Sequence, residues 1–311
     1  MSLENKEIVE TINSLFVKDN YSYSEYILTQ LKKPEILSLF KEIMNKSNKT
    51  ISEVVIVFLA ALRFVEKDIN ALTKIEKTKS FDSFVNKHYH DILEVSIKRK
   101  VQANIPERGL PILEILGKEF TGAPIGVIEL GASYGLIGSS MLNPNITLWK
   151  QNDYFKANQK MPGNPKEIDY YLGIDIDPPE KDWLLACLYE PGDAKRMQSY
   201  IDHIDRGKNF ELIKASALGF SKLKEVIEFT SKNMIIVVLT SFMLYQLAED
   251  QQNILKDEIL KFTRVKNRHW IQQEVELFGK KGEPEYYIAL DGKKIISLED
   301  DKCGNWKWIN P

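Results

Sequence analysis

The chain has 311 residues, of which 43% are hydrophobic and 28% are charged, and its formal net charge is −2. A chain of this size and composition can bury a large core and is typical of a globular protein with about two domains. Because a nearly neutral chain creates no field that attracts nucleic acid or an anionic membrane, we predict neither as a partner.

The sequence carries no signal for secretion, membrane insertion or metal binding. Its first residues, MSLENKEIVE, are acidic and lack the apolar core of a signal peptide. The longest apolar runs, 54–62 and 234–245, are too short to cross a bilayer. Cys187 and Cys303 lie far apart, so neither a zinc site nor a disulfide framework is indicated. We therefore expect a cytoplasmic protein without a metal site.

Apolar side chains recur at helical spacing through the first part of the chain. Ile8 and Ile12, for example, share one face of a predicted helix. Ser52 is a candidate N-cap for another helix over 54–64. Without any strand-like alternation in this part, the pattern predicts a helical N-terminal domain over residues 1–120.

Residues 121–311 have a different pattern, in which short β-branched apolar runs alternate with helical segments. The predicted strands are 126–130, 170–177, 210–216, 234–241 and 269–275. The predicted helices between them are 180–189, 192–206, 219–229 and 248–263. Continuous apolar strands alternating with helices indicate a parallel sheet that is buried on both faces.

The chain ends with two alternating runs separated by Asp291 and Gly292, which is a strong signal for a β-hairpin. A parallel sheet completed by an antiparallel strand is typical of methyltransferase folds. The predicted fold class is therefore α/β, with a Rossmann-like methyltransferase-type sheet, mostly parallel with an antiparallel last strand, and a helical N-terminal domain.

A glycine-containing loop follows the first predicted strand, in IELGASYGLIG. Glu129, Gly131, Ser133 and Gly135 match the methyltransferase pattern acid-x-G-x-G-x-G with one serine in place of glycine. The dinucleotide pattern G-x-G-x-x-G fits less well, because Ser133 and Leu136 occupy two of its glycine positions. We expect the N-terminus of the following helix to point at a ligand.

The predicted cofactor is S-adenosylmethionine, and Glu129, Gly131, Ser133 and Gly135 of the strand end and loop would bind it. The loop also resembles G-x-x-x-G-x-G of short-chain dehydrogenases, which use a Tyr-x-x-x-Lys pair. No tyrosine of this chain has a lysine four residues later. An NAD-dependent oxidoreductase therefore remains as the second alternative.

Two further strand ends are predicted to contact the cofactor. Asp175 ends the second strand, where a carboxylate can accept both ribose hydroxyls, and Asp177 is its possible substitute. Ser216 ends the third strand, where many methyltransferases carry an acid that contacts adenine. The long segment 141–168 is predicted to be an insertion, either a lid over the site or a surface loop.

The fourth predicted strand ends in LTSFMLYQL. Thr240, Ser241 and Tyr245 are predicted to face the pocket, with the first two binding substrate and Tyr245 acting in catalysis. The Asn/Asp-Pro-Pro-aromatic motif of enzymes that methylate nucleobases is absent here. We therefore predict a small polar molecule as substrate, and the sequence indicates no oligomeric state.

The C-terminal part of the chain resembles the bacterial domain of unknown function 2332 over residues 95–310. Arg99, Gln102, Asn104 and Arg108 match its R-x-x-Q-T-N-x-x-x-R stretch. IELGASYGLIG, GIDIDP, WLLACLYEPGDAKRM, VLTSFMLYQL and the closing LDG…CGNWKW follow in the family's order. The resemblance implies a methyltransferase-like fold. We predict that Gln102 and Asn104 bind substrate and that Arg108, suited to carboxylate recognition, acts in catalysis.

The chain departs from that family at three positions. Ser216 replaces an Asp, Thr240 replaces a His, and Cys303 replaces a His. The first hypothesis is a methyltransferase that acts on a small polar substrate. These departures favour an alternative, a catalytically inactive ligand-binding or interaction protein on the same fold.

Overall fold

The chain folds into two compact units in a computed structural model. The first comprises Met1–Ala103 and Pro179–Asp202, and the second comprises Asn104–Pro178 and His203–Pro311. No helix of the described residues is both long enough and apolar enough to cross a membrane. The structure describes residues 3–18, 24–68, 70–102, 104–143, 163, 165–188, 191–204, 206–220, 234–276, 284–299 and 305–309.

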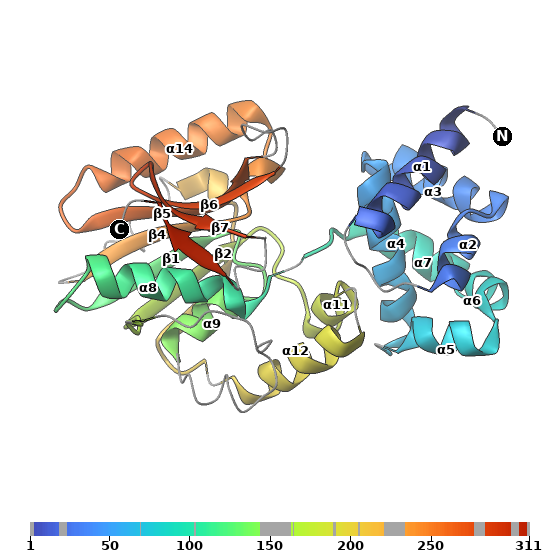
Figure 1. Cartoon of the computed structure of the whole chain (residues 1–311), viewed down its shortest axis with the longest axis horizontal. Helices are drawn as coiled ribbons and strands as arrows, with labels where there is room; N and C mark the ends of the chain where they lie inside the picture. Colours follow the sequence, from blue (N-terminus) through green and yellow to red (C-terminus); the bar gives the residue numbers. More distant parts are fainter. Residues whose placement is uncertain are drawn as a thin grey trace. The chain divides into compact units, whose positions relative to one another are not determined.

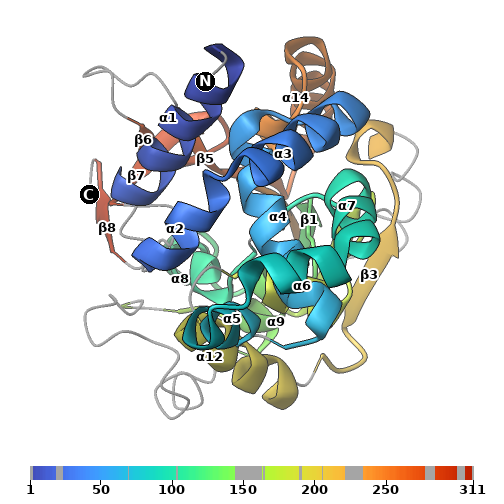
Figure 2. The ribbon, with the colours of Figure 1, turned by 90° about the vertical axis from the view of Figure 1, so that its right-hand side faces the viewer.

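The first unit is helical, as predicted, and α4 lies among its other helices (Figure 2). Val54, Phe58 and Leu62 are among the fully buried side chains of α4. The N-cap of α4 is Thr50 and not the predicted Ser52, because Thr50 and Glu53 form a reciprocal capping box. The helices are α1 Leu3–Lys18, α2 Glu25–Leu31, α3 Pro34–Ser47, α4 Ile51–Glu66, α5 Ala71–Thr78, α6 Phe81–Lys87 and α7 Tyr89–Lys98.

Helix α11 (Lys181–Ala186) and nearly all of α12 (Pro191–His203) also belong to the first unit, although the chain reaches them between two strands of the sheet. Trp183 is buried in a cluster with side chains of α4, and its indole nitrogen donates to the carbonyl of Lys100 at 2.9 Å. Arg63 of α4 donates to the carbonyl of Ala186 at 2.6 Å. These contacts explain why residues 179–202 group with the first unit, although the predicted boundary between residues 120 and 121 assigned them to the second.

The second unit is built on one sheet of eight strands, in the order β3-β2-β1-β4-β5-β6-β7-β8. The first five in chain order pair in parallel, and the last three continue from β5 as an antiparallel meander. The Rossmann-like fold class is thus confirmed. The strands are β1 Ile125–Leu130, β2 Tyr170–Asp175, β3 Phe210–Lys214, β4 Ile235–Ser241, β5 Arg268–Glu276, β6 Glu285–Leu290, β7 Lys293–Leu298 and β8 Trp306–Trp308.

The antiparallel part contains the two strands of the predicted hairpin and a third strand, β8, and so extends beyond the antiparallel last strand of the predicted fold class. The predicted turn is present between β6 and β7, with Asp291 and Gly292 both at positive φ. Strand β8 adds a further edge, and the indole nitrogens of Trp306 and Trp308 both donate to the carboxylate of Glu114, at 2.8 and 2.9 Å. Because Glu114 lies on α8 (Gly109–Glu119), these two hydrogen bonds connect the last strand to a helix that packs on the sheet.

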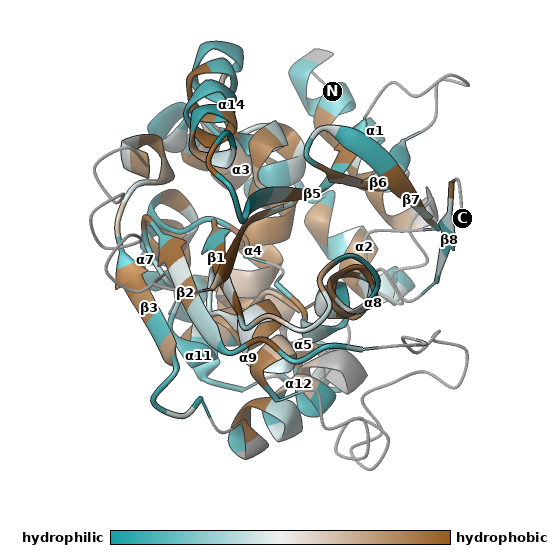
Figure 3. Ribbon diagram, turned by 90° about the vertical axis from the view of Figure 1, so that its left-hand side faces the viewer, coloured by the Kyte–Doolittle hydropathy of each residue, from teal (hydrophilic) through white to brown (hydrophobic). Residues whose placement is uncertain are grey.

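Helices cover both faces of the sheet, α14 on one and α8 and α9 on the other (Figure 1). The bounds of these helices are Gly109–Glu119 for α8, Leu136–Leu142 for α9 and Glu249–Thr263 for α14. Helix α14 carries both hydrophilic and hydrophobic side chains (Figure 3), and its buried residues are Leu255, Ile259 and Phe262. The apolar faces of the helices and the alternate side chains of the strands form two cores, one on each side of the sheet.

Three predicted helices, 180–189, 192–206 and 248–263, correspond to α11, α12 and α14. The predicted helix 219–229 and the predicted insertion 141–168 lie largely outside the described residues. The strand order reverses between β1 and β4, since β1 continues to β2 on one side and has β4 on the other. In open α/β sheets, ligands bind beyond the carboxyl ends of the strands at this reversal.

Candidate functional site

Buried polar side chains gather near the carboxyl ends of β1, β2, β4 and β5, in the second unit. Burying so many polar groups in one region is unfavourable unless they bond one another or a ligand. This concentration makes the region the candidate site. We call the set the polar cluster; it consists of Asn104, Glu107, Arg108, Glu129, Ser133, Asp175, Thr240, Ser241, Gln273 and Glu274.

The loop after β1 folds back onto the end of β2. The backbone N–H groups of Gly131 and Ala132 donate to the carbonyl of Ile174 at 2.8 and 3.1 Å, and that of Ser133 donates to Asp175 Oδ2 at 2.7 Å. Gly131, Ser133 and Gly135 all have positive φ, at 73°, 51° and 75°. The loop therefore takes the tight course that its glycines predicted, with Ser133 held in a conformation that glycine adopts more readily.

Protein side chains already pack against both loop glycines. A Cβ added to Gly131 would lie 2.5 Å from Cγ of Met243, and one added to Gly135 would lie 2.6 Å from Cζ of Phe210. Packing and backbone conformation together explain why these positions require glycine. The glycines alone are therefore no argument for a ligand, and the case for one depends on the neighbouring polar groups.

Glu129 lies fully buried at the end of β1. Its Oε2 accepts a hydrogen bond from the Tyr171 hydroxyl at 2.6 Å, and its Oε1 lies 3.5 Å from Nδ2 of Asn104. Burial raises the pKa of Glu129 to about 8, although the bonds from Tyr171 and Asn104 oppose that shift. The same Asn104 amide donates to the carbonyl of Ala132 at 2.9 Å. Glu129 thus connects to the loop through Asn104.

Asp175 ends β2, and each of its carboxylate oxygens accepts one backbone N–H. Oδ2 accepts from Ser133 at 2.7 Å and Oδ1 from Asp177 at 2.9 Å. Each oxygen has a further lone pair that can accept from a ligand. The next side chain, Ile176, is 69% exposed, which is unusual for a large apolar residue beside a strand end. Asp177 is exposed and forms an ion pair with Lys214 at 2.6 Å.

The residues at the end of β4 point to opposite faces of the sheet, as strand alternation requires. Thr240 is fully buried, and its Oγ1 accepts from the indole nitrogen of Trp270 at 3.3 Å. Ser241 donates to Gln273 Oε1 at 2.7 Å, and Gln273 donates in turn to the carbonyl of Arg108 at 2.9 Å. Thr240 and Ser241 therefore do not face one common pocket.

Arg108 is buried in the polar cluster, with its guanidinium carbon 4.3 Å from the ring centroid of Phe242. Its positive charge lowers the pKa of both Glu129 and Glu274 against the larger effect of burial. Arg108 is thus within electrostatic range of both buried acids. Tyr245, predicted to act in catalysis, is about half exposed on the short helix η3 (Leu244–Gln246).

Glu274 is a member of the polar cluster that sequence reasoning missed. Its Oε1 accepts from the backbone N–H groups of Met243 and Leu244 at 3.3 and 3.2 Å. Burial raises the pKa of Glu274 to about 7, while those two bonds lower it. Its Oε2 is buried and has no hydrogen-bond partner among the described residues. The available signal was an acid in the predicted strand HWIQQEV, near its carboxyl end.

Several other predicted residues are not members of the polar cluster. Gln102 belongs to the first unit, whereas the residues of the cluster belong to the second. Ser216 is exposed after β3, and its hydroxyl oxygen accepts from the N–H of Leu218 at 3.3 Å, which caps a short helical turn. Cys303 lies outside the described residues. In the described part of the chain, no group of His, Cys, Asp or Glu side chains is arranged to hold a metal ion.

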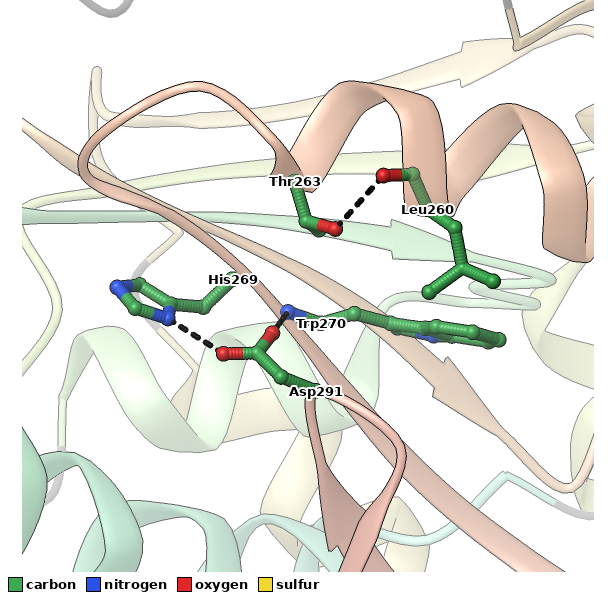
Figure 4. A network of polar contacts seen from close by, with 5 residues as sticks. All are labelled: Leu260, Thr263, His269, Trp270 and Asp291. Atoms are coloured by element: carbon green, nitrogen blue, oxygen red, sulfur yellow. Dashed lines mark hydrogen bonds and ion pairs between the residues drawn. The ribbon is translucent and has the colours of Figure 1, made fainter.

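His269 is the second residue of β5, and its ring lies beside the carboxylate of Asp291 (Figure 4). Its Nδ1 is 2.8 Å from Asp291 Oδ2, and Asp291 Oδ1 accepts from the backbone N–H of Trp270 at 2.8 Å. The pair joins the start of β5 to the hairpin turn. We therefore assign His269 a structural role.

Comparisons with known proteins add little to this geometry. No family model matches the chain, and no curated protein is similar to it in sequence. One solved structure with a similar arrangement is the plantazolicin methyltransferase BamL in complex with a triazolic desmethylPZN analog and SAH. It is 11% identical, with a TM-score of 0.26, over 76% of this chain and 59% of that chain. A similarity at this level carries no argument, and the Rossmann-like fold class rests on the strand order and pairing of this chain.

Proposed function

We propose that the second unit binds S-adenosylmethionine beyond the ends of β1 and β2 and acts on a small polar substrate. The observation that carries the proposal is the carboxylate of Asp175, held by two backbone N–H groups beside the exposed Ile176. An acid at this position of a Rossmann-like sheet suits two adjacent ribose hydroxyls, and an exposed apolar side chain suits a flat base. When bound, the cofactor would supply a methyl group on a cationic sulfur.

The strand ends offer such a ligand both hydrogen-bonding groups and an apolar side chain. Asp175 offers a lone pair on each oxygen to the ribose hydroxyls, while Ile176 covers one face of adenine. Asn104 Oδ1 is buried without a hydrogen-bond partner in the described part of the chain, and we assign it to an N–H donor of the ligand. Ser216, at the end of β3, can donate its hydroxyl to adenine while accepting from the backbone.

We assign Glu129 to positioning the loop, because its carboxylate faces Tyr171 and Asn104. Arg108 can pair with a carboxylate of cofactor or substrate, since its fork of donors suits that geometry. Tyr245 is about half exposed and follows β4, where the substrate would lie. These side chains would act by orienting the reactants, which is the main source of acceleration in such a reaction.

The proposal is tested by isothermal titration calorimetry with S-adenosylmethionine and S-adenosylhomocysteine. We expect micromolar binding by the wild-type protein and roughly tenfold weaker binding by Asp175→Asn, which removes a charge-assisted acceptor. Asp177→Asn is the matched control, since it makes the same change in an exposed carboxylate two residues away. Absence of heat at millimolar ligand contradicts the proposal, and equal affinities of wild type and Asp175→Asn contradict the assigned position.

A non-catalytic binding protein is the second candidate. Packing of Met243 and Phe210 against the loop glycines holds the loop without a ligand, and this observation favours a retained fold with lost chemistry. That candidate predicts binding without turnover. Release of S-adenosylhomocysteine from labelled cofactor in the presence of a metabolite extract would exclude it. Displacement of bound S-adenosylhomocysteine by NAD would instead favour the oxidoreductase alternative.

A further inference from the structure

Glu274 combines three properties that a structural acid would not need together. It is 3% exposed, one carboxylate oxygen is fixed by two backbone N–H groups, and the other has no hydrogen-bond partner within the described ranges. Leaving a buried carboxylate oxygen without a hydrogen bond is unfavourable, because the oxygen has lost its contact with water. An anchored acid with one available oxygen is suited to receive a hydrogen-bond donor from a ligand.

The position of Glu274 in the sheet separates it from the proposed cofactor contacts. Asp175 ends β2, whereas Glu274 lies on β5, with β1 and β4 between them. Neighbouring strands are about 4.8 Å apart, so these two acids lie on strands roughly 14 Å apart. A cofactor held at β2 and extending across β1 would reach β4. The space beyond the carboxyl end of β5 is then left for a second molecule, the substrate.

We propose that Glu274 Oε2 accepts a proton from an N–H or O–H group of the substrate, which makes that substrate an amine, amide or alcohol. This inference rests on the proposed function. The proton leaves the N–H or O–H bond for Oε2, and the electron pair of that bond forms the new bond to the methyl carbon. The electron pair of the broken carbon–sulfur bond stays on sulfur, so the donor leaves as a neutral thioether.

The surroundings of Glu274 allow it to act as such a base near neutral pH. The charged or titratable groups that act on it come from three elements: Arg108 from the turn before α8, Lys256 from α14 and Tyr287 from β6. The two cations lower the pKa of Glu274, but burial has the larger effect and brings the pKa to about 7. A base with a pKa near the working pH is the most effective for proton transfer.

The test compares the wild-type protein with Glu274→Gln and with the control Glu276→Gln. Glu276 lies on the same strand but is exposed and pairs with Lys294 at 2.6 Å. The probe for binding is S-adenosylhomocysteine, measured by calorimetry in all three proteins. We expect equal affinities, because Glu274 is assigned to the substrate and not to the cofactor. Failure of the wild-type protein to bind the probe would overturn the proposed function itself.

The probe for turnover is methyl-labelled S-adenosylmethionine with a small-molecule metabolite extract. We expect a product labelled on nitrogen or oxygen, a rate reduced at least about 100-fold in Glu274→Gln, and a rate within about twofold of wild type in Glu276→Gln. The wild-type rate should rise with pH through about 7. A product labelled on carbon or sulfur, or full activity of Glu274→Gln, would overturn the inference, as would probe binding without any turnover.

An independent readout does not depend on activity. Infrared difference spectra recorded across pH 6 to 8 should contain a carboxyl band that titrates near pH 7 and is lost in Glu274→Gln but kept in Glu276→Gln. A spectrum that is the same in all three proteins would show that Glu274 does not change protonation in this range, and would contradict its role as a base.

Discussion

Burial of the Glu129 carboxyl should make the free energy of unfolding depend on pH. Burial raises its pKa from 4.5 to about 8, so the folded protein keeps a proton that the unfolded chain releases. The two pKa values differ by about 3.5, and this difference corresponds to roughly 5 kcal/mol of unfolding free energy at about 1.4 kcal/mol for each unit of pKa. Because the folded pKa is raised, this contribution is complete below pH 4.5 and is lost as the pH rises through about 8.

Glu129→Gln removes the titration while keeping the shape of the side chain and an oxygen that can accept from Tyr171. We expect the variant to gain stability relative to the wild-type protein as the pH rises, by roughly 4 kcal/mol between pH 5 and pH 8. Glu274 changes protonation in both proteins. Its effect on the pH dependence of the unfolding free energy therefore cancels when the variant is compared with the wild-type protein. The exposed Glu119→Gln on α8 is the control, because it makes the same chemical change in a side chain that faces solvent.

The assay is urea unfolding at a series of pH values, followed by tryptophan fluorescence. Trp270 and Trp306 are buried in the second unit, so their emission reports on the unit that contains Glu129. If the difference in unfolding free energy between Glu129→Gln and wild type stays constant from pH 5 to pH 8, the raised pKa of Glu129 is contradicted. Such a result would mean that Glu129 ionises in the folded protein as easily as in the unfolded chain.

Three further substitutions test local packing, hydrogen bonding and helix capping in the two units. Gly138→Ala should destabilise the second unit by about 1–3 kcal/mol, because the new methyl would lie 2.1 Å from the ring of Tyr171; Gly219→Ala, with open space around it, should change thermal unfolding little. Glu114→Ala should leave two indole N–H groups of β8 without their acceptor and lower the urea midpoint by an amount equivalent to about 1–3 kcal/mol. Thr50→Ala should cost about 1 kcal/mol through loss of the N-cap of α4, measured by the same unfolding experiment.

Most of the sheet could be predicted because its strands are continuous apolar runs with clear turn signals. Runs such as GVIEL and MIIVVLTS are buried on both faces, and this gives them the composition of central parallel strands. The hairpin was predictable from two residues, Asp291 and Gly292, because only a few residue types adopt positive φ readily. In these segments, the types of neighbouring residues were enough to predict the structure.

The sequence could not predict which unit α11 and α12 join. Their chain position between β2 and β3 indicated ordinary crossover helices, but the burial of Trp183 against α4 depends on residues far away in the chain. The cap at Thr50 was missed for a related reason. Both Thr50 and Ser52 carry a hydroxyl, and the bond to Glu53 selects the first.

The loop after β1 was predicted correctly in its conformation, but two of its features depend on tertiary packing. The neighbours of Gly131 and Gly135 come from distant segments, and so do the partners of Glu129. Glu274 was missed because an acid in a half-apolar strand usually faces solvent. Its burial depends on the backbone turn after β4, which no local pattern indicates.

The most direct test of the account is a crystal structure of the protein with S-adenosylhomocysteine. The account predicts that both ribose hydroxyls lie within hydrogen-bonding distance of the Asp175 carboxylate, with adenine against Ile176. A ligand bound elsewhere, or crystals that take up none at millimolar concentration, would contradict it.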